Sequence, residues 1–261
     1  MTPILLLGAG HMGGALIAGW RRAHAFPMHE LLVRDPSPGA DARQSGANLH
    51  PSIADQRAAQ TVVLAVKPQL WKLAAAEVAH ELAPGAVIVS IVAGVAGSDI
   101  GAAFGGRRVA RVMPMTAAAI CKGVASVYAA DPEARARARA LFEPLGTVVD
   151  LDDEDLLHAA TAVSGSAPAY LYAFVEALEA AGVSLGLSPE AARDLARATT
   201  AGAAALMTES GADAAELRRQ VTSPAGTTEA ALKLLLGEHG LTPLLKAAAA
   251  AAEQRSRELG R

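Results

Sequence analysis

The sequence predicts an α/β protein in which a doubly wound parallel sheet over residues 1–154 is followed by an all-α domain over residues 155–261. The first observation is that short buried runs alternate with helical segments in the N-terminal half. This alternation is typical of strand–helix–strand units with right-handed crossovers. The second observation is that β-branched clusters become rare after residue 155, where helix-forming Ala, Leu, Glu and Arg dominate.

Composition narrows the possible classes of protein. The chain has 261 residues and a formal net charge of -3, which allows one large core or two modest ones. Without clustered Lys and Arg, a nucleic-acid surface is not expected. The single cysteine, Cys121, fits a reducing compartment, so we expect the cytoplasm. Glycines and His11 interrupt the apolar N-terminal stretch, which predicts neither a signal peptide nor a membrane span. The scattered histidines predict no metal site.

The N-terminal half divides into short strands and intervening helices. Two weaker strand signals follow the main series and are expected to finish the sheet around one more helix. We predict strands over residues 4–7, 30–33, 61–66, 86–91 and 108–112, a helix over 70–82, the weaker strands over 124–128 and 147–151, and the last helix over 132–141.

A glycine-rich turn joins the first predicted strand to the first predicted helix. It reads Gly8-x-Gly10-x-x-Gly13, with His11 and Met12 inside it. Such glycines allow a tight turn, close approach to a pyrophosphate and close packing of helix on strand, while free N–H groups face the phosphates. In this context the motif predicts a dinucleotide site in a Rossmann-like domain rather than a plain glycine turn. We expect His11 to be a turn residue exposed near the phosphates.

The end of the second predicted strand leaves the choice between cofactors open. The chain reads Val33-Arg34-Asp35-Pro36-Ser37 there. An acid binds the ribose 2′-OH of NADH, whereas Arg34 or the Ser37 hydroxyl suits the 2′-phosphate of NADPH. Both cofactors therefore stay possible.

Three further strand ends belong to the same cleft, because open parallel sheets bind ligands at their carboxyl edge. Each alone is compatible with an ordinary loop. Together they complete the predicted cofactor site with Ala65, Val66, Lys67 and Pro68 after one strand, Ala93 and Gly94 after the next, and Met113 and Pro114 at the third.

The C-terminal half predicts helices over residues 168–183, 189–210, 213–220 and 241–259. The helix that begins at Pro189 is rich in Ala and Gly, which favours close helix packing. Its apolar sides exceed what one small bundle buries, so we expect oligomerisation through this half.

The stretch VTSPAGTT over residues 221–228 breaks this helical pattern. Ser223 and Pro224 lead into a turn, and Thr227 begins the next helix. Hydroxyls and backbone N–H groups converge there, where the helix dipole favours an anion. Glu229 is assigned a structural role at the helix N-terminus.

Taken together, these segments resemble the pyrroline-5-carboxylate reductases. The resemblance covers essentially the whole chain, and its last two blocks are the specific ones. The blocks are GAGHMG (8–13), AVKP (65–68), SIVAG (90–94), MPMT (113–116), SGSAPAY (164–170) and VTSPAGTT (221–228).

The resemblance implies hydride transfer from NADPH, with NADH possible, to the C=N carbon of 1-pyrroline-5-carboxylate, which gives L-proline. It implies that Ser223 and the N–H groups around Gly226 and Thr227 bind the carboxylate, and that Thr228 lies near the ring nitrogen as the catalytic residue. Ser166 has two interpretations of equal weight, a helix cap and a substrate-binding residue. The family also forms homodimers and assemblies of dimers.

Two departures from the family pattern affect details of the site. Met115 stands where the family usually has Asn, and Ala225 stands where it usually has Gly. If residue 225 needs a left-handed backbone, alanine costs about 1 kcal/mol or more. Two alternatives stay open: a related NAD(P)H-dependent imine or hydroxyacid oxidoreductase, and a non-catalytic dinucleotide sensor.

Overall fold

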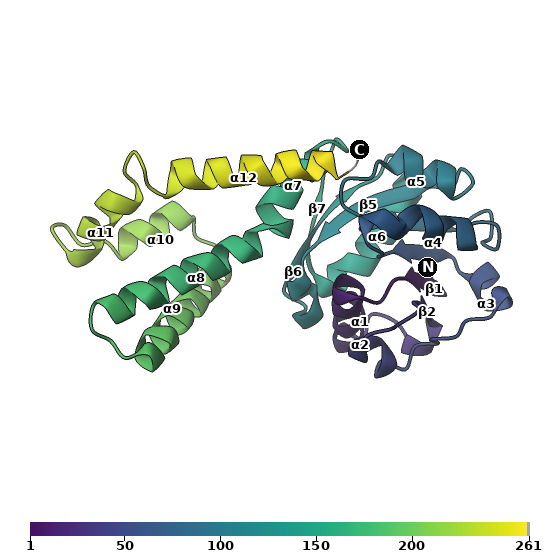
Figure 1. Cartoon of the computed structure of the whole chain (residues 1–261), viewed down its shortest axis with the longest axis horizontal. Helices are drawn as coiled ribbons and strands as arrows, with labels where there is room; N and C mark the ends of the chain where they lie inside the picture. The colour runs from purple at the N-terminus through teal and green to yellow at the C-terminus, as the bar shows by residue number, and fades with distance from the viewer. Residues whose placement is uncertain (260–261) are drawn as a thin grey trace. The chain divides into compact units, whose positions relative to one another are not determined.

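The computed structural model describes residues 1–259. It contains two compact units, one formed by residues 1–165 with residues 251–259 and the other by Ser166–Ala250 (Figure 1). The expected boundary at residues 154 and 155 lies slightly earlier, and the first unit also includes the end of the last helix.

The first unit is built on one sheet. In residues 1–259 the sheet has seven strands in the order β2-β1-β3-β4-β5-β6-β7. The first five are parallel, as expected from the alternation of strands and helices. The strands are β1 (Ile4–Leu7), β2 (Leu31–Arg34), β3 (Thr61–Leu64), β4 (Val87–Ser90), β5 (Val109–Pro114), β6 (Gly123–Tyr128) and β7 (Gly146–Asp150).

The sheet is mostly, not entirely, parallel. β6 runs antiparallel to β5, and β7 is parallel to β6. Only residues 115–122, with a short 3-10 helix at Thr116–Ile120, join β5 to β6. A parallel crossover needs about a dozen residues or more, so this connection turns the chain back. Helix α6 (Pro132–Phe142) then supplies the crossover to β7.

Helices cover both faces of the sheet, because alternate residues of each strand point to opposite sides. Ile4 and Leu6 pack in the cluster that includes α1 (His11–Ala23) and α6. Leu5 and Leu7 pack in the other cluster, with α4 (Trp71–Val78) and α5 (Gly97–Ala103). The short helices α2 (Ala40–Arg43) and α3 (Ile53–Ala58) lie between β2 and β3 in the chain.

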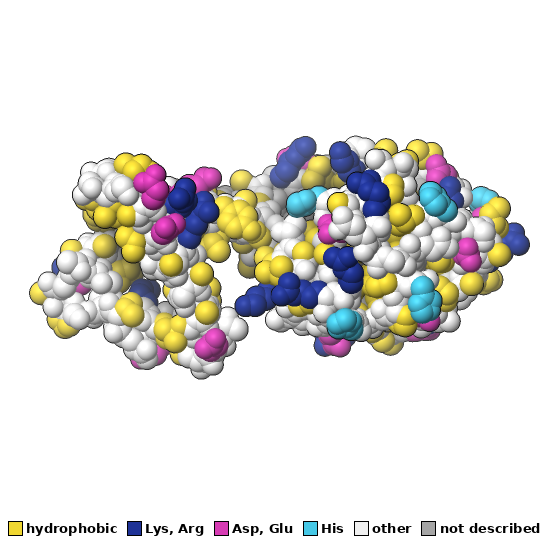
Figure 2. Space-filling view, turned by 90° about the horizontal axis from the view of Figure 1, so that it is seen from below, with side chains coloured by type: hydrophobic (Ala, Val, Ile, Leu, Met, Phe, Trp, Pro, Cys, Tyr) yellow, Lys and Arg dark blue, Asp and Glu magenta, His cyan; other side chains and the backbone are white. Residues whose placement is uncertain are grey.

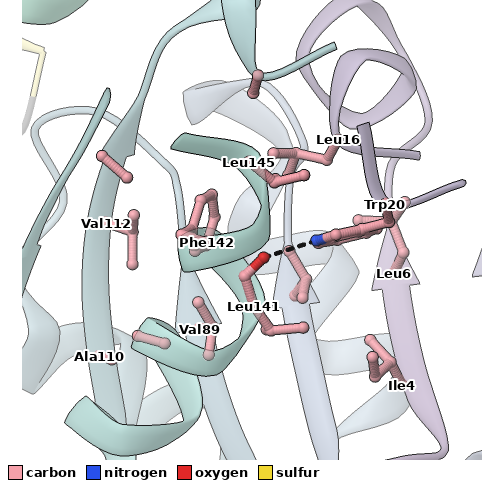
Figure 3. Packing of buried hydrophobic residues seen from close by; sticks show 14 of the residues in the cluster. Ile4, Leu6, Leu16, Trp20, Val89, Ala110, Val112, Leu141, Phe142 and Leu145 are labelled. Carbon is pink, nitrogen blue, oxygen red and sulfur yellow. Dashed lines mark hydrogen bonds between the residues drawn. The ribbon is translucent and has the colours of Figure 1, made fainter. Parts of the chain in front are cut away.

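Trp20 is the largest side chain in the first cluster and is fully buried. Its Nε1 donates a 2.8 Å hydrogen bond to the Leu141 carbonyl (Figure 3). This bond gives the buried indole N–H a partner and ties α1 to α6. The clusters therefore fix the start of α1 relative to the ends of the strands.

The second unit consists of helices, as predicted. α8 and α9 pack closely, since a Cβ added to Gly182 would lie 3.0 Å from the Ala192 Cβ. Within Ser166–Ala250 many large apolar side chains are exposed, among them Phe174 and Leu234. Figure 2 shows hydrophobic side chains on the surface of the protein. The helices are α8 (Ala167–Ser184), α9 (Pro189–Ser210), α10 (Ala214–Gln220), α11 (Thr227–Leu235) and α12 (Leu241–Glu258).

The last turns of α12 return to the first unit and bind α7 (Leu156–Ala160) and the residue before it. Arg257 donates to both carboxylate oxygens of Asp155, at 2.5 and 2.8 Å. His158 Nδ1 lies 2.9 Å from the Ser256 hydroxyl. Burial, followed by the charges of Arg257 and Arg111, lowers the pKa of His158 below its ordinary value. In the part of the chain that the structure describes, no helix is long and apolar enough to cross a membrane.

Candidate functional site

The glycine turn after β1 is packed tightly against β3. Gly8 has a φ of 94°, and a Cβ there would lie 2.7 Å from the Ala65 carbonyl oxygen. A Cβ on Gly13 would lie 2.3 Å from the Gly8 carbonyl oxygen. Both distances are shorter than the closest approach that a Cβ and an oxygen make without a clash, so only glycine fits at these two positions.

Gly10 lies at the open end of the same turn and precedes α1. A Cβ there would meet no described atom within 4 Å. No described side chain caps α1 at Gly10, so the N–H groups of the first turn face outward. This is the combination that a pyrophosphate needs: room for close approach, and donors at the positive end of a helix dipole. His11 is exposed beside it, as predicted, and Met12 is half-buried.

Asp35 links this turn to the loop after β2. Its Oδ2 accepts the Ala9 N–H at 2.6 Å, and its Oδ1 accepts the Ser37 N–H at 2.7 Å. Each carboxylate oxygen has a second lone pair, so Asp35 is still able to accept a hydrogen bond from a ribose 2′-OH. The Ser37 side chain is exposed at the same edge.

Arg34 points to the face of the sheet that α4 covers. Its Nη1 donates to Gln56 Oε1 at 3.1 Å, and its Nη2 lies 3.0 Å from Glu77 Oε2. Arg34 and Asp35 are neighbours in sequence and both are half-buried. The structure gives the two residues different partners, a difference that the sequence alone does not reveal.

The ends of β3 and β4 supply the next part of the cleft edge. Ala65, Val66 and Pro68 are half-buried after β3, whereas Lys67 is exposed. Ala93 and Gly94 follow β4, in a segment that leads to α5. These positions agree with the predicted carboxyl edge of the sheet.

Glu154 holds the end of this segment. Its Oε1 accepts the Gly97 N–H at 2.6 Å and also lies 2.9 Å from Arg111 Nη1. The Arg111 side chain is only 6% exposed, so its charge is buried and depends on this carboxylate. Glu154 thereby fixes the segment that carries Ala93 and Gly94.

The end of β5 meets a π-helical turn at Thr161–Gly165. A Cβ on Gly165 would lie 3.4 Å from the Met113 sulfur, so the backbone at Gly165 lies close to the Met113 side chain. Met113 and Met115 are half-buried, and Pro114 is buried. The Met115 side chain carries a thioether, which supplies no hydrogen-bond donor at this position.

In the second unit, residues 223–226 form a turn. The Gly226 N–H donates to the Ser223 carbonyl at 3.0 Å, Pro224 occupies the second position, and Ala225 has a φ of 55°. Pro followed by a residue of positive φ is typical of a type II turn. Ala225 therefore has the left-handed backbone for which a glycine is favoured.

The residues predicted to bind the substrate differ in whether their N–H and hydroxyl groups already have hydrogen-bond partners. The Gly226 N–H donates to the Ser223 carbonyl within the turn, and the role expected of Gly226 toward the substrate stays a prediction. The first-turn N–H groups of Thr227 and Thr228 follow the uncapped helix start at Gly226. Among the described residues, the hydroxyls of Ser223, Thr227 and Thr228 have no hydrogen-bond partner.

Ser166 precedes α8, but its side chain caps no backbone N–H of the described chain. Its backbone is helical, with φ -91° and ψ -27°, which turns the hydroxyl away from the capping position. The capping interpretation is therefore wrong. The alternative interpretation, a hydroxyl available to substrate, stays a prediction.

Two family profiles match the chain. The profile described as pyrroline-5-carboxylate reductase dimerisation matches residues 154–259. The profile described as NADP oxidoreductase, coenzyme F420-dependent, matches residues 3–94. A pyrroline-5-carboxylate reductase from Pseudomonas aeruginosa is 41% identical, over 99% of this chain and 97% of that protein. The chain belongs to the pyrroline-5-carboxylate reductase family.

Solved structures of pyrroline-5-carboxylate reductases have the same fold. The enzyme from Coxiella burnetii matches with a TM-score of 0.90 and 30% identity, over 100% of this chain and 99% of that one. The crystal structure of the Plasmodium falciparum pyrroline carboxylate reductase, with NADP bound, matches with a TM-score of 0.86 and 25% identity, covering 100% and 98%. The predicted fold class and family are confirmed.

One residue beside the candidate site was missed in the sequence. Glu154 lies in the acidic run LDDED, where its neighbours make it look like a solvated charge. Gly165 lies inside the block SGSAPAY, and the π-helical turn brings it close to the Met113 side chain. A charged residue predicted inside a strand, Arg111, was the available signal that a buried carboxylate partner exists.

Proposed function

We propose that this chain reduces 1-pyrroline-5-carboxylate to L-proline with NAD(P)H. The observation that carries the proposal is the open, uncapped helix start at Gly10, which offers backbone donors to a pyrophosphate. The loop from Ser223 to Thr228 adds a second, separate set of free donors for a carboxylate.

The cofactor residues divide by task. The turn from Gly8 to Gly13 binds the pyrophosphate, and Asp35 or Arg34 contacts the ribose according to the cofactor. The strand ends at Ala65–Pro68, Ala93, Gly94, Met113 and Pro114 line the remaining length of the dinucleotide. When bound, NAD(P)H supplies the hydride.

The substrate carboxylate binds the loop of the second unit. Ser223 donates its hydroxyl, and Thr227 and Thr228 donate the N–H groups of the first turn of α11. The dipole of α11 favours the negative charge at this end. The turn at Ala225 presents these groups together on one short segment.

The chemistry requires little acid–base apparatus. The protonated imine nitrogen makes the adjacent carbon electrophilic, so two electrons and the hydride hydrogen enter at carbon while the C=N π electrons become the amine lone pair. Thr228 orients the ring nitrogen or relays its proton. Catalysis is thus chiefly a matter of orientation and electrostatics.

The helical unit supports a homodimer, or an assembly of dimers. Its exposed apolar residues, such as Leu171, Phe174 and Leu234, need a cover that Ser166–Ala250 does not itself provide. The dimerisation profile spans the same helices. The single cysteine, Cys121, is consistent with a cytoplasmic enzyme.

One assay tests the function. Purified protein is mixed with 1-pyrroline-5-carboxylate and either NADPH or NADH, and cofactor absorbance and proline are followed together. Proline formed in proportion to cofactor oxidised supports the proposal. Turnover of another imine or of a hydroxyacid, but not of pyrroline-5-carboxylate, supports a related oxidoreductase instead. Cofactor binding without turnover of any of these substrates supports a sensor.

A further inference from the structure

We propose that Glu77, on α4, sets the preference between NADPH and NADH by competing for the guanidinium of Arg34. This inference rests on the proposed dinucleotide site, and it concerns the 2′ position of the adenosine ribose. Glu77 lies outside the loop that follows β2. Sequence reading did not identify it as a site residue.

The register of β2 explains why Glu77 and Arg34 meet. Leu32 points to the face covered by α4, where it packs in the cluster with Trp71 and Val78. Arg34 is two residues further on, so its side chain points to the same face. Glu77 is the residue next to Val78 on α4, and its Oε2 lies 3.0 Å from Arg34 Nη2.

Arg34 is held from a second side by Gln56. Its Nη1 donates to Gln56 Oε1 at 3.1 Å, and Gln56 is only 4% exposed. A buried side chain with a fixed position is a firm anchor. Removal of the Glu77 charge therefore leaves the guanidinium in place, and Glu77 is not needed to orient it.

The charges decide the direction of the effect. Of the two groups at this strand end that suit a 2′-phosphate, the Arg34 guanidinium is the charged one, and Glu77 is paired with it. The carboxylate also repels a phosphate that contacts the same guanidinium. Neither interaction affects the 2′-OH of NADH, for which Asp35 retains accepting capacity.

The effect is modest, because both side chains are partly in water. Arg34 is 40% exposed and Glu77 is 47% exposed. Charge pairs of this kind are worth up to about 1 kcal/mol, which corresponds to about a fivefold change in affinity. Glu77 thus adjusts the preference between cofactors without abolishing the binding of either.

Calorimetric titration of the intact protein with two probes tests this inference. Adenosine 2′,5′-bisphosphate and adenosine 5′-monophosphate differ only in the 2′-phosphate. Glu77→Gln is expected to tighten binding of the bisphosphate by about threefold, with binding of the monophosphate unchanged. The ratio of KM values for NADH and NADPH is expected to rise by the same factor.

Glu81→Gln is the matched control. Glu81, just beyond the end of α4, also pairs with an arginine, with its Oε2 3.0 Å from Arg57 Nη2, and its Oε1 lies 3.1 Å from His80 Nε2. It is expected to leave both affinities unchanged. Arg34→Met is expected to weaken the bisphosphate alone and to remove the effect of Glu77→Gln.

The outcomes separate the two proposals. If both probes bind, but Glu77→Gln does not raise the affinity for the bisphosphate relative to that for the monophosphate, the role of Glu77 is refuted while the dinucleotide site stands. If neither probe, NADPH nor NADH binds the unaltered protein, the dinucleotide site and the role of Glu77 both fall.

Discussion

The backbone N–H of Ala225 donates a 2.7 Å hydrogen bond to Glu229 Oε2, four residues further along the chain. Glu229 lies in the first turn of α11, and its carboxylate accepts a backbone N–H of the loop that precedes the helix. This contact confirms the structural role expected for Glu229. It also holds Ala225 in a backbone conformation that alanine disfavours.

We expect Ala225→Gly to stabilise the protein by about 1 kcal/mol, because it removes the left-handed penalty of an L side chain. The free energy of unfolding from urea titration measures this change. Ala203→Gly, within α9, is the control and is expected to destabilise by about 1 kcal/mol, since glycine there loses helix propensity. A destabilising Ala225→Gly contradicts the strain assigned to the turn.

Thr228→Ala is expected to lower kcat by about tenfold to a hundredfold, while the Kd of the cofactor is unchanged. The hydroxyl has no partner among the described residues, so its loss leaves no internal bond broken. Steady-state kinetics and cofactor titration separate the two effects. Thr228→Ser is expected to retain most activity, and an unaltered kcat in Thr228→Ala removes this residue from the mechanism.

Glu154→Ala is expected to destabilise the protein by about 3 kcal/mol, because it leaves the buried Arg111 charge unpaired. It also frees the Gly97 N–H, so the segment with Ala93 and Gly94 loses its anchor. We therefore expect a higher KM for NAD(P)H at temperatures where the variant is folded.

Glu143→Ala serves as the comparison for Glu154→Ala. Glu143 pairs with Arg139 at the surface, 2.5 Å apart, and its loss is expected to cost less than about 1 kcal/mol. Equal costs for the two substitutions contradict the role of burial at Arg111.

The pKa of His158 predicts a pH dependence of stability. Burial and the nearby Arg257 and Arg111 lower this pKa from its ordinary value of 6.5, so the unfolded chain binds a proton more readily than the folded one. Stability from this group is complete above pH 6.5 and declines as the pH falls toward the lower, folded pKa. Melting temperatures across this interval measure the decline.

His158→Gln is expected to reduce that decline, because the amide stays neutral over the whole interval. His29→Gln, at an exposed position, is the control. A melting temperature that depends on pH equally in all three proteins refutes the assignment to His158.

Much of the architecture was predictable because it follows from local periodicity. The strands, the glycine turn and the long helices lie within a few residues of their predicted ranges. The direction of β6 was not apparent from strand propensity, because it depends on the length of the connection from Pro114 to Gly123. A count of those linking residues predicts the reversal.

The site was predictable at the level of segments and less so at the level of atoms. The sequence left Arg34 and Asp35 as equivalent candidates, and only their partners in the structure separate them: Arg34 contacts side chains of α3 and α4, whereas Asp35 accepts backbone N–H groups beside the glycine turn. Ser166 was given a capping role from its place before Pro168, yet its helical backbone prevents that bond. Glu154 was missed, because its partners Gly97 and Arg111 are distant in sequence.

The ion pair between Arg257 and Asp155 joins two residues that the ribosome adds about a hundred positions apart. During translation, residues 1–165 emerge before the helical unit, but the segment that completes their packing follows it. The dinucleotide-binding unit therefore acquires its last contacts only after the entire helical unit has been synthesised. A ribosome stalled between the two segments holds a cofactor domain without its final helix.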